Sequence, residues 1–184
     1  MNGELHILLV EDSADDAELV KQALLQAGFA PALHRVDSAA GLAAALAQRH
    51  WDMVISDYNL PGFSGTEALQ LLRAHSAYIP FIVVSGGIGE EEAVALMKSG
   101  ADDYVMKDRL ARLVPAVERS LREARNRLES RIAQLALRES EARFKAIVSN
   151  MPGMVFQLEF GHNDSPSFAY VSDGCLALLG APAL

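Results

Sequence analysis

Polar and charged side chains follow four short apolar runs of the sequence. Glu11 and Asp12 follow the run ILLV, Asp57 follows MVIS, Ser85 follows FIVV and Lys107 follows YVM. A single aspartate in a loop is usually no more than a solvated residue. Four runs that all end in this way are difficult to assign to chance, and they indicate one common site.

Three carboxylates at one site repel one another, so the site needs a raised pKa, a bound cation, or both. Oxygen ligands with no histidine or cysteine nearby are typical of Mg²⁺. With a cation present, Asp57 could attack a phosphoryl donor, and Lys107 could neutralise another phosphoryl oxygen. The Ser85 hydroxyl is suited to hydrogen-bond the phosphoryl group, and the product would be an aspartyl phosphate. In the alternative interpretation, Lys107 and Asp57 form a plain salt bridge and the other acids are solvated.

The apolar runs themselves have the length and composition of strands that are buried on both faces. They lie at Ile7–Val10, Met53–Ser56, Phe81–Val84 and Tyr104–Met106, with a weaker run near Ala32–Val36. Parallel strands of this kind bind ligands at their carboxyl ends, where the connection order reverses. The side chains that follow the runs should therefore meet at one edge of the sheet.

Segments with helical periodicity separate these runs. One ends at Gly28, a second is capped by Ser38, and two more lie over 67–74 and 91–99. A fifth helix begins near Leu110. Strands that alternate with helices predict an α/β fold, namely a five-stranded parallel, doubly wound, flavodoxin-like sheet with five helices and right-handed crossovers.

Composition excludes several classes of protein. The formal net charge of −8 argues against a nucleic-acid groove, which needs a basic patch. The single cysteine, Cys175, excludes an internal disulfide and fits a reducing compartment. The N-terminal segment MNGELHILLVED is neither a signal peptide nor a membrane span, because it has no basic region and only a short apolar run. We therefore expect a cytoplasmic protein with no membrane association within this stretch of chain.

The segments LLVED, VISDYNLPGFSG, VVSGG and GADDYVMKD, in this order, resemble the receiver domains of bacterial two-component response regulators over about residues 4 to 124. The resemblance implies that Asp57 is the phosphorylation site. It also implies that Asp12 binds Mg²⁺ directly, Glu11 through water, and Asn59 through its backbone carbonyl. The phosphoryl group would come from a phosphohistidine of a sensor histidine kinase or phosphotransfer protein. Such a domain catalyses only its own phosphorylation and dephosphorylation.

The same resemblance assigns the switch residues and marks two departures from the family pattern. Ser85 would be the switch hydroxyl, Tyr104 the switch aromatic, and Lys107 the lysine that contacts the phosphoryl group. Asp108 follows the lysine where the family usually has proline, and two glycines follow Ser85 where alanine is common. Residues 1–110 are predicted to form the receiver core.

The sequence after the receiver core predicts one long helix. Apolar residues continue at spacings of three and four, with one stutter between Leu128 and Ile132. The pattern favours a parallel homodimeric coiled coil over residues 111–142, although an amphipathic helix packed on the receiver is the alternative. The predicted dimer seam consists of Val117, Leu121, Ala124, Leu128, Ile132 and Leu135.

Residues 143–184, with the segments ESEARFKAIVSNMPGMVFQLEF and SFAYVSDGCLALLG, resemble the beginning of a PAS sensor domain. The resemblance implies a helix over Arg143–Asn150, strands over Met154–Phe160 and Ser167–Val171, and a short helix that begins at Asp173. The predicted function is a phospho-accepting receiver that signals through a dimeric helix to this PAS region and an output region.

Three other functions fit the sequence less well. An FMN-binding protein would need a Ser/Thr/Gly loop after the first strand, whereas the loop here is the acidic EDSADD. A phosphatase of the haloacid-dehalogenase type would need a second aspartate where Ala14 stands. A degenerate receiver would act only as an interaction surface, and acetyl phosphate with Mg²⁺ would leave it unmodified.

Overall fold

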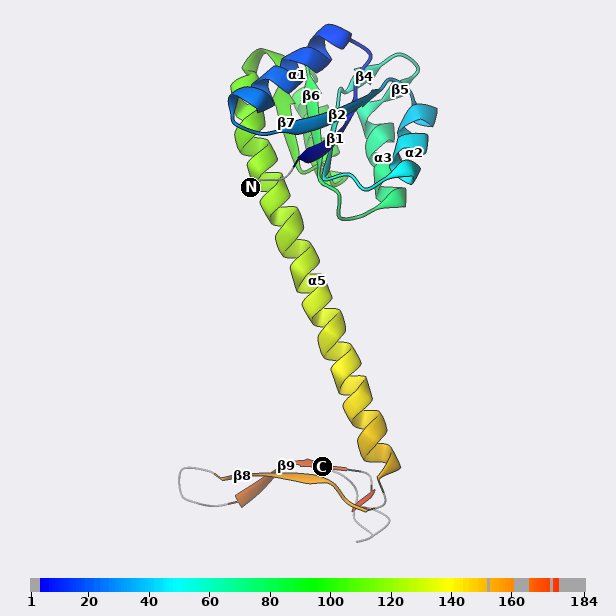
Figure 1. Cartoon of the computed structure of the whole chain (residues 1–184), viewed down its shortest axis with the longest axis vertical. Helices are drawn as coiled ribbons and strands as arrows, with labels where there is room; N and C mark the ends of the chain where they lie inside the picture. The colour runs from blue at the N-terminus through cyan, green and yellow to red at the C-terminus, as the bar shows by residue number, and fades with distance from the viewer. Residues whose placement is uncertain (1–3, 152, 161–165, 173, 176–184) are drawn as a thin grey trace. The chain divides into compact units, whose positions relative to one another are not determined.

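The computed structural model describes residues 4–151, 153–160, 166–172 and 174–175. The chain divides into two compact units, Met1–Leu128 and Glu129–Leu184. Figure 1 labels most of their helices and strands. Within the described ranges, no helix combines the length and the apolar character that crossing a membrane requires.

The first unit is built on a five-stranded parallel sheet, as the sequence predicts. Its strands are β1 (Leu5–Val10), β2 (Pro31–Val36), β3 (Met53–Ser56), β6 (Phe81–Ser85) and β7 (Asp103–Met106). They lie in the order β2-β1-β3-β6-β7 and every neighbouring pair is parallel. The chain adds β2 on one side of β1 and then adds β3, β6 and β7 on the other side. The connection order therefore reverses between β1 and β3.

Five helices follow these strands: α1 (Ala14–Gln26), α2 (Ala39–Gln48), α3 (Gly65–His75), α4 (Glu90–Lys98) and α5 (Leu113–Asn150). Successive strand residues point to opposite faces of the sheet. Leu8 and Val54 accordingly pack in one apolar cluster with α2 and α3, whereas Leu9 and Ile55 pack in a second cluster with α1 and the start of α5. The doubly wound α/β fold is confirmed (Figure 1).

Serine caps fix the beginnings of three helices. The hydroxyl oxygens of Ser13, Ser38 and Ser64 accept from backbone amides in the first turns of α1, α2 and α3. Gly28 follows α1 with a φ of 83°, which glycine adopts more readily than other residues. The cap at Ser38 and the stop at Gly28 are both as predicted.

The entry into α5 differs from the prediction. A six-residue 3₁₀ segment, η1 (Lys107–Arg112), comes first, so α5 begins at Leu113 rather than near Leu110. Val117 is fully buried in the core of the first unit, and Leu121 is half-buried against it. Val117 therefore cannot belong to a dimer seam. The stripe that covers a sheet has the same spacing as a coiled-coil seam, and the sequence pattern alone could not separate them.

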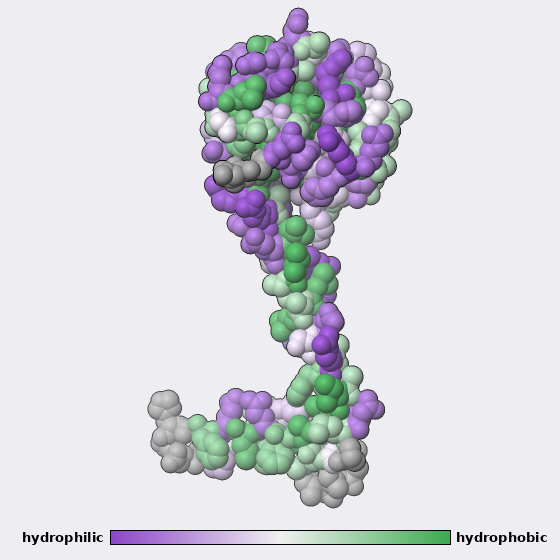
Figure 2. Space-filling view, in the orientation of Figure 1, coloured by the Kyte–Doolittle hydropathy of each residue, from purple (hydrophilic) through white to green (hydrophobic). Residues whose placement is uncertain are grey.

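Further along α5, the apolar side chains of the predicted seam are exposed. Leu128, Ile132 and Leu135 all lie on the surface of the described chain. Figure 2 shows hydrophobic residues along this helix. The exposed part of the seam thus begins near the point where the first unit ends.

The second unit contains the rest of α5 and an antiparallel pair, β8 (Phe156–Phe160) and β9 (Pro166–Val171). The helix predicted over Arg143–Asn150 is the last part of α5. Cys175 is buried. The short helix predicted to begin at Asp173 starts outside the described residues.

Candidate functional site

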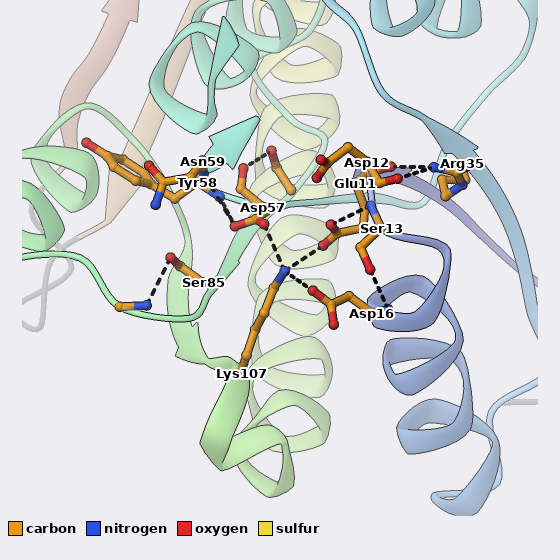
Figure 3. Close-up of polar contacts among 12 residues, drawn as sticks. Glu11, Asp12, Ser13, Asp16, Arg35, Asp57, Tyr58, Asn59, Ser85 and Lys107 are labelled. Atoms are coloured by element: carbon orange, nitrogen blue, oxygen red, sulfur yellow. Dashed lines mark hydrogen bonds and ion pairs between the residues drawn. The ribbon is translucent and has the colours of Figure 1, made fainter. Parts of the chain in front are cut away.

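The predicted site residues lie at the carboxyl edge of the sheet (Figure 3). Glu11 and Asp12 follow β1, Asp57 follows β3, Ser85 ends β6, and Lys107 follows β7 as the first residue of η1. Segments that are far apart in the sequence meet here because parallel strands end at a common edge.

The ammonium group of Lys107 contacts three carboxylates. Its Nζ donates to Glu11 Oε2 at 3.0 Å, to Asp57 Oδ2 at 2.8 Å and to Asp16 Oδ2 at 2.5 Å. An ammonium group has three N–H donors, so these three bonds use all of them. The contacts with Glu11 and Asp57 follow from the strand-end pattern, whereas Asp16 was not predicted.

Glu11, Asp12 and Asp57 form the acidic group of the site. One carboxylate oxygen from each lies within 4.8 Å of the other two. Glu11 is only 2% exposed and Asp57 8%, whereas Asp12 is exposed. The burial of Glu11 contradicts the alternative in which it is a solvated turn residue. Oxygen donors from three acids, without histidine or cysteine, fit a hard divalent cation such as Mg²⁺.

Both oxygens of the Asp57 carboxylate have partners. Oδ1 accepts from the backbone amides of Tyr58 at 2.6 Å and Asn59 at 3.4 Å, while Oδ2 accepts from Lys107. The start of α3 packs tightly against this loop. A Cβ atom added at Gly65 would lie only 3.0 Å from the Asp57 carbonyl oxygen. The carboxylate is therefore held in a fixed orientation at the carboxyl edge.

Arg35 stabilises the loop that carries the acidic pair. Its guanidinium donates from Nη1 to the backbone carbonyl oxygens of Glu11 at 2.9 Å and Asp12 at 3.1 Å. The Ser13 amide donates to Glu11 Oε1 at 3.1 Å. Arg35 is part of β2, next to β1, and only the strand order and register bring it to this loop.

Burial raises the pKa of Glu11 above its ordinary value, and hydrogen bonds from Lys107 and the Ser13 amide offset part of this rise. Burial alone would lower the pKa of Lys107, but its hydrogen bonds to Asp16, Asp57 and Glu11 raise the pKa instead. Lys107 therefore stays charged at neutral pH. One positive charge among these acids leaves the site with an excess of carboxylates.

The two predicted switch residues lie apart from the Lys107 contacts. Ser85 is fully buried, and its hydroxyl accepts from the Gly87 amide at 3.4 Å; within the described chain, Asp57 is not among its hydrogen-bond partners. Tyr104 is half-buried and packs against the cluster under α2 and α3. Asn59 lies in β4 (Asn59–Leu60) and is exposed. The switch roles and the carbonyl ligand remain predictions.

Comparison with known proteins agrees with this geometry. The sequence profile of the family described as response regulator receiver domain matches residues 7–118. The chain is 35% identical over 101 residues to the response regulator protein FleR of Pseudomonas aeruginosa. This match covers 55% of this chain and 21% of FleR. The chain therefore belongs to the response regulator receiver domain family.

Solved structures share the fold. A response regulator receiver domain protein from Methanospirillum hungatei is 25% identical with a TM-score of 0.60, over 68% of this chain and 99% of that one. The receiver domain of the sensor histidine kinase PA1611 from Pseudomonas aeruginosa is 21% identical with a TM-score of 0.56, over 65% of this chain and 98% of that one. That second structure holds a magnesium ion in its active-site cleft.

The match to curated relatives is partial. This chain covers 21% of FleR, 33% of the regulatory protein DctD and 49% of the regulatory protein PrrA. What the chain shares with them is the receiver domain of two-component signalling. The activities of those longer proteins are not transferred by this match.

Proposed function

We propose that Asp57 accepts a phosphoryl group from a phosphohistidine of a sensor histidine kinase or phosphotransfer protein. The observation that carries the proposal is the Asp57 carboxylate, which lies 2.8 Å from the Lys107 ammonium and beside two further acids. An attacking carboxylate next to a fixed positive charge is what phosphoryl transfer requires, because charge builds on the phosphoryl oxygens.

Mg²⁺ is the cation that we propose for this site, on Glu11, Asp12, Asp57 and the backbone carbonyl of Asn59. The oxygen-only donor set supports it, and so does the ion in the cleft of the PA1611 receiver. When bound, Mg²⁺ reduces the repulsion between the carboxylate and the anionic donor.

The chain's own residues account for the rest of the transfer. An oxygen of Asp57 forms a bond to phosphorus while the P–N bond of the phosphohistidine breaks, and the imidazole nitrogen leaves with the electron pair. Lys107 then donates to a phosphoryl oxygen. The Ser85 hydroxyl moves toward the phosphoryl group and donates its O–H to another phosphoryl oxygen, and Tyr104 turns inward to fill the space that Ser85 leaves.

Acetyl phosphate and Mg²⁺ test the acceptor. We expect intact-mass measurement to show one added phosphoryl group on the wild type and none on Asp57→Asn. Asp37→Asn is the matched control, since Asp37 is an exposed aspartate that follows β2 at the same edge of the sheet. A full mass shift in Asp57→Asn would contradict the assignment. An unmodified wild type would favour the degenerate receiver.

We also propose that the signal leaves the receiver through a parallel homodimer of α5 and reaches a PAS region over residues 143–184. An uninterrupted helix of 38 residues supports this relay, as do the exposed side chains of Leu128, Ile132 and Leu135. Ala124 is half-buried and lies just before this exposed seam. The helix–hairpin order of residues 143–171 is consistent with the opening elements of a PAS domain.

Sedimentation of the whole chain tests the dimer. We expect a dimer at high micromolar concentration, converted to monomer by Leu128→Glu or Leu135→Glu, because a buried charge at a seam position is costly. Leu137→Glu is the control, since Leu137 is also exposed but lies off the seam. A monomeric wild type, or equal loss of dimer in the control, defeats the relay.

A further inference from the structure

Asp16 is a fourth acid at the site, and it differs from the other three. It lies in the first turn of α1, where its backbone amide donates to the capping hydroxyl of Ser13 at 3.2 Å. Its carboxylate accepts from Lys107 Nζ, as Figure 3 shows. It does not belong to the group of Glu11, Asp12 and Asp57 whose oxygens converge.

Lys107 has no donor to spare in this arrangement, because its three N–H groups serve Glu11, Asp16 and Asp57. Phosphorylation changes only one of these acceptors directly, since the phosphoryl group is attached to Asp57. Asp16 stays an anionic acceptor on a capped helix, and its side chain is two-thirds shielded from solvent. Asp16 therefore continues to attract the same ammonium group that the phosphoryl oxygens need.

We propose that Asp16 is a positioning residue that competes with the phosphoryl group for Lys107 and thereby slows phosphorylation of Asp57. The inference rests on the proposed acceptor function. The negative charge of Asp16 also slows phosphorylation, because it repels the anionic donor that must approach Asp57. Removing the charge of Asp16 should leave Lys107 freer to donate to the incoming phosphoryl oxygen.

The rate of phosphorylation by acetyl phosphate measures this competition. In that reaction an Asp57 oxygen bonds to phosphorus, the bond from phosphorus to the acetyl oxygen breaks, and acetate leaves. We expect Asp16→Asn to react roughly five-fold faster than wild type, the factor for a Lys107 hydrogen bond weakened by about 1 kcal/mol when its acceptor loses its charge. Asp15→Asn is the matched control, because Asp15 is exposed in the same turn and loses the same charge. We expect its rate to stay close to that of the wild type.

A double-mutant cycle distinguishes competition for Lys107 from a general structural effect. In a Lys107→Ala background, Asp16→Asn should accelerate the reaction no more than Asp15→Asn does. Asp16→Glu, which restores an anionic carboxylate, should return the rate toward that of the wild type. Equal acceleration in both backgrounds, or a rate in Asp16→Asn no higher than in Asp15→Asn, would overturn the inference while leaving Asp57 as the acceptor. A wild type that takes up no phosphoryl group would overturn both proposals.

Discussion

Strand β7 has an ion cluster at each end, and the two clusters have opposite balances of charge. At its carboxyl end, one lysine contacts the carboxylates of Glu11, Asp16 and Asp57. Just before its amino end, one carboxylate, that of Asp102, lies between two arginines. The first cluster has more acids than its single cation can neutralise, whereas the second has two cations for its single acid.

Asp102 shows what a saturated cluster looks like. Its Oδ2 accepts from Arg73 at 3.1 Å and from the Phe81 amide at 2.9 Å, and its Oδ1 accepts from Arg127 at 2.8 Å. These bonds join α3, β6 and α5 through one side chain that is 7% exposed. Burial lowers the pKa of Arg73, and Asp102 offsets this effect. A single acid between two arginines holds elements together, whereas several acids around one lysine leave negative charge that can attract a cation.

The largest effect on stability is expected for Asp102, just before the amino end of β7. Asp102→Ala should lower the free energy of unfolding by about 2–3 kcal/mol, because it leaves Arg73 partly buried without its carboxylate. Arg127 is 45% exposed and contributes less. Urea denaturation gives the value, and uptake of a phosphoryl group at Asp57 should be retained.

Asp103→Ala is the control for this comparison. Asp103 pairs with Arg119, which is about half exposed, so its loss should cost less than about 1 kcal/mol. Equal destabilisation by the two variants would show that the Asp102 cluster stabilises the fold no more than the exposed pair of Asp103 does. Loss of phosphorylation in Asp102→Ala would show that the two ends of β7 are not separate in function.

Much of the carboxyl-end cluster could be predicted from the sequence, because parallel strands deliver their following residues to one edge. That rule was sufficient for Glu11, Asp12, Asp57 and Lys107. It could not find Asp16, which lies in the first helical turn and joins the cluster only because the Lys107 side chain extends to it.

The strand-end rule could not predict the cluster around Asp102 or the packing of the start of α5. The contact of Arg127 with Asp102 depends on how α5 packs along the sheet, and sequence spacing does not define that packing. The same limitation explains Val117, whose apolar spacing fits both a buried stripe and a dimer seam. Strand ends can be predicted from local patterns, whereas helix faces depend on tertiary packing.

The effect of Mg²⁺ on stability should depend on the acids at the carboxyl end of β7 and not on Asp102. Mg²⁺ should raise the unfolding free energy of the wild type by about 1.4 kcal/mol at ten times its dissociation constant. Asp12→Ala should lose this response and melt at a higher temperature than wild type in EDTA, since it removes a like charge. Asp102→Ala should keep the response. Identical wild-type melting curves in EDTA and in excess Mg²⁺ would exclude the metal site.

The smallest effect concerns pH and the burial of Glu11. Because burial raises its pKa in the folded protein, Glu11 holds its proton above pH 4.5 while the unfolded chain releases it. In EDTA, Glu11 therefore makes stability fall as pH rises from about 4.5 through its folded pKa. Glu11→Gln should remove this part of the fall and leave a flatter profile of unfolding free energy against pH. The effect is small because Lys107 and the Ser13 amide offset part of the burial. Glu4→Gln, at an exposed position, controls for the change in charge. A steeper fall in Glu11→Gln than in this control would mean that the contact with Lys107, rather than burial, dominates at Glu11.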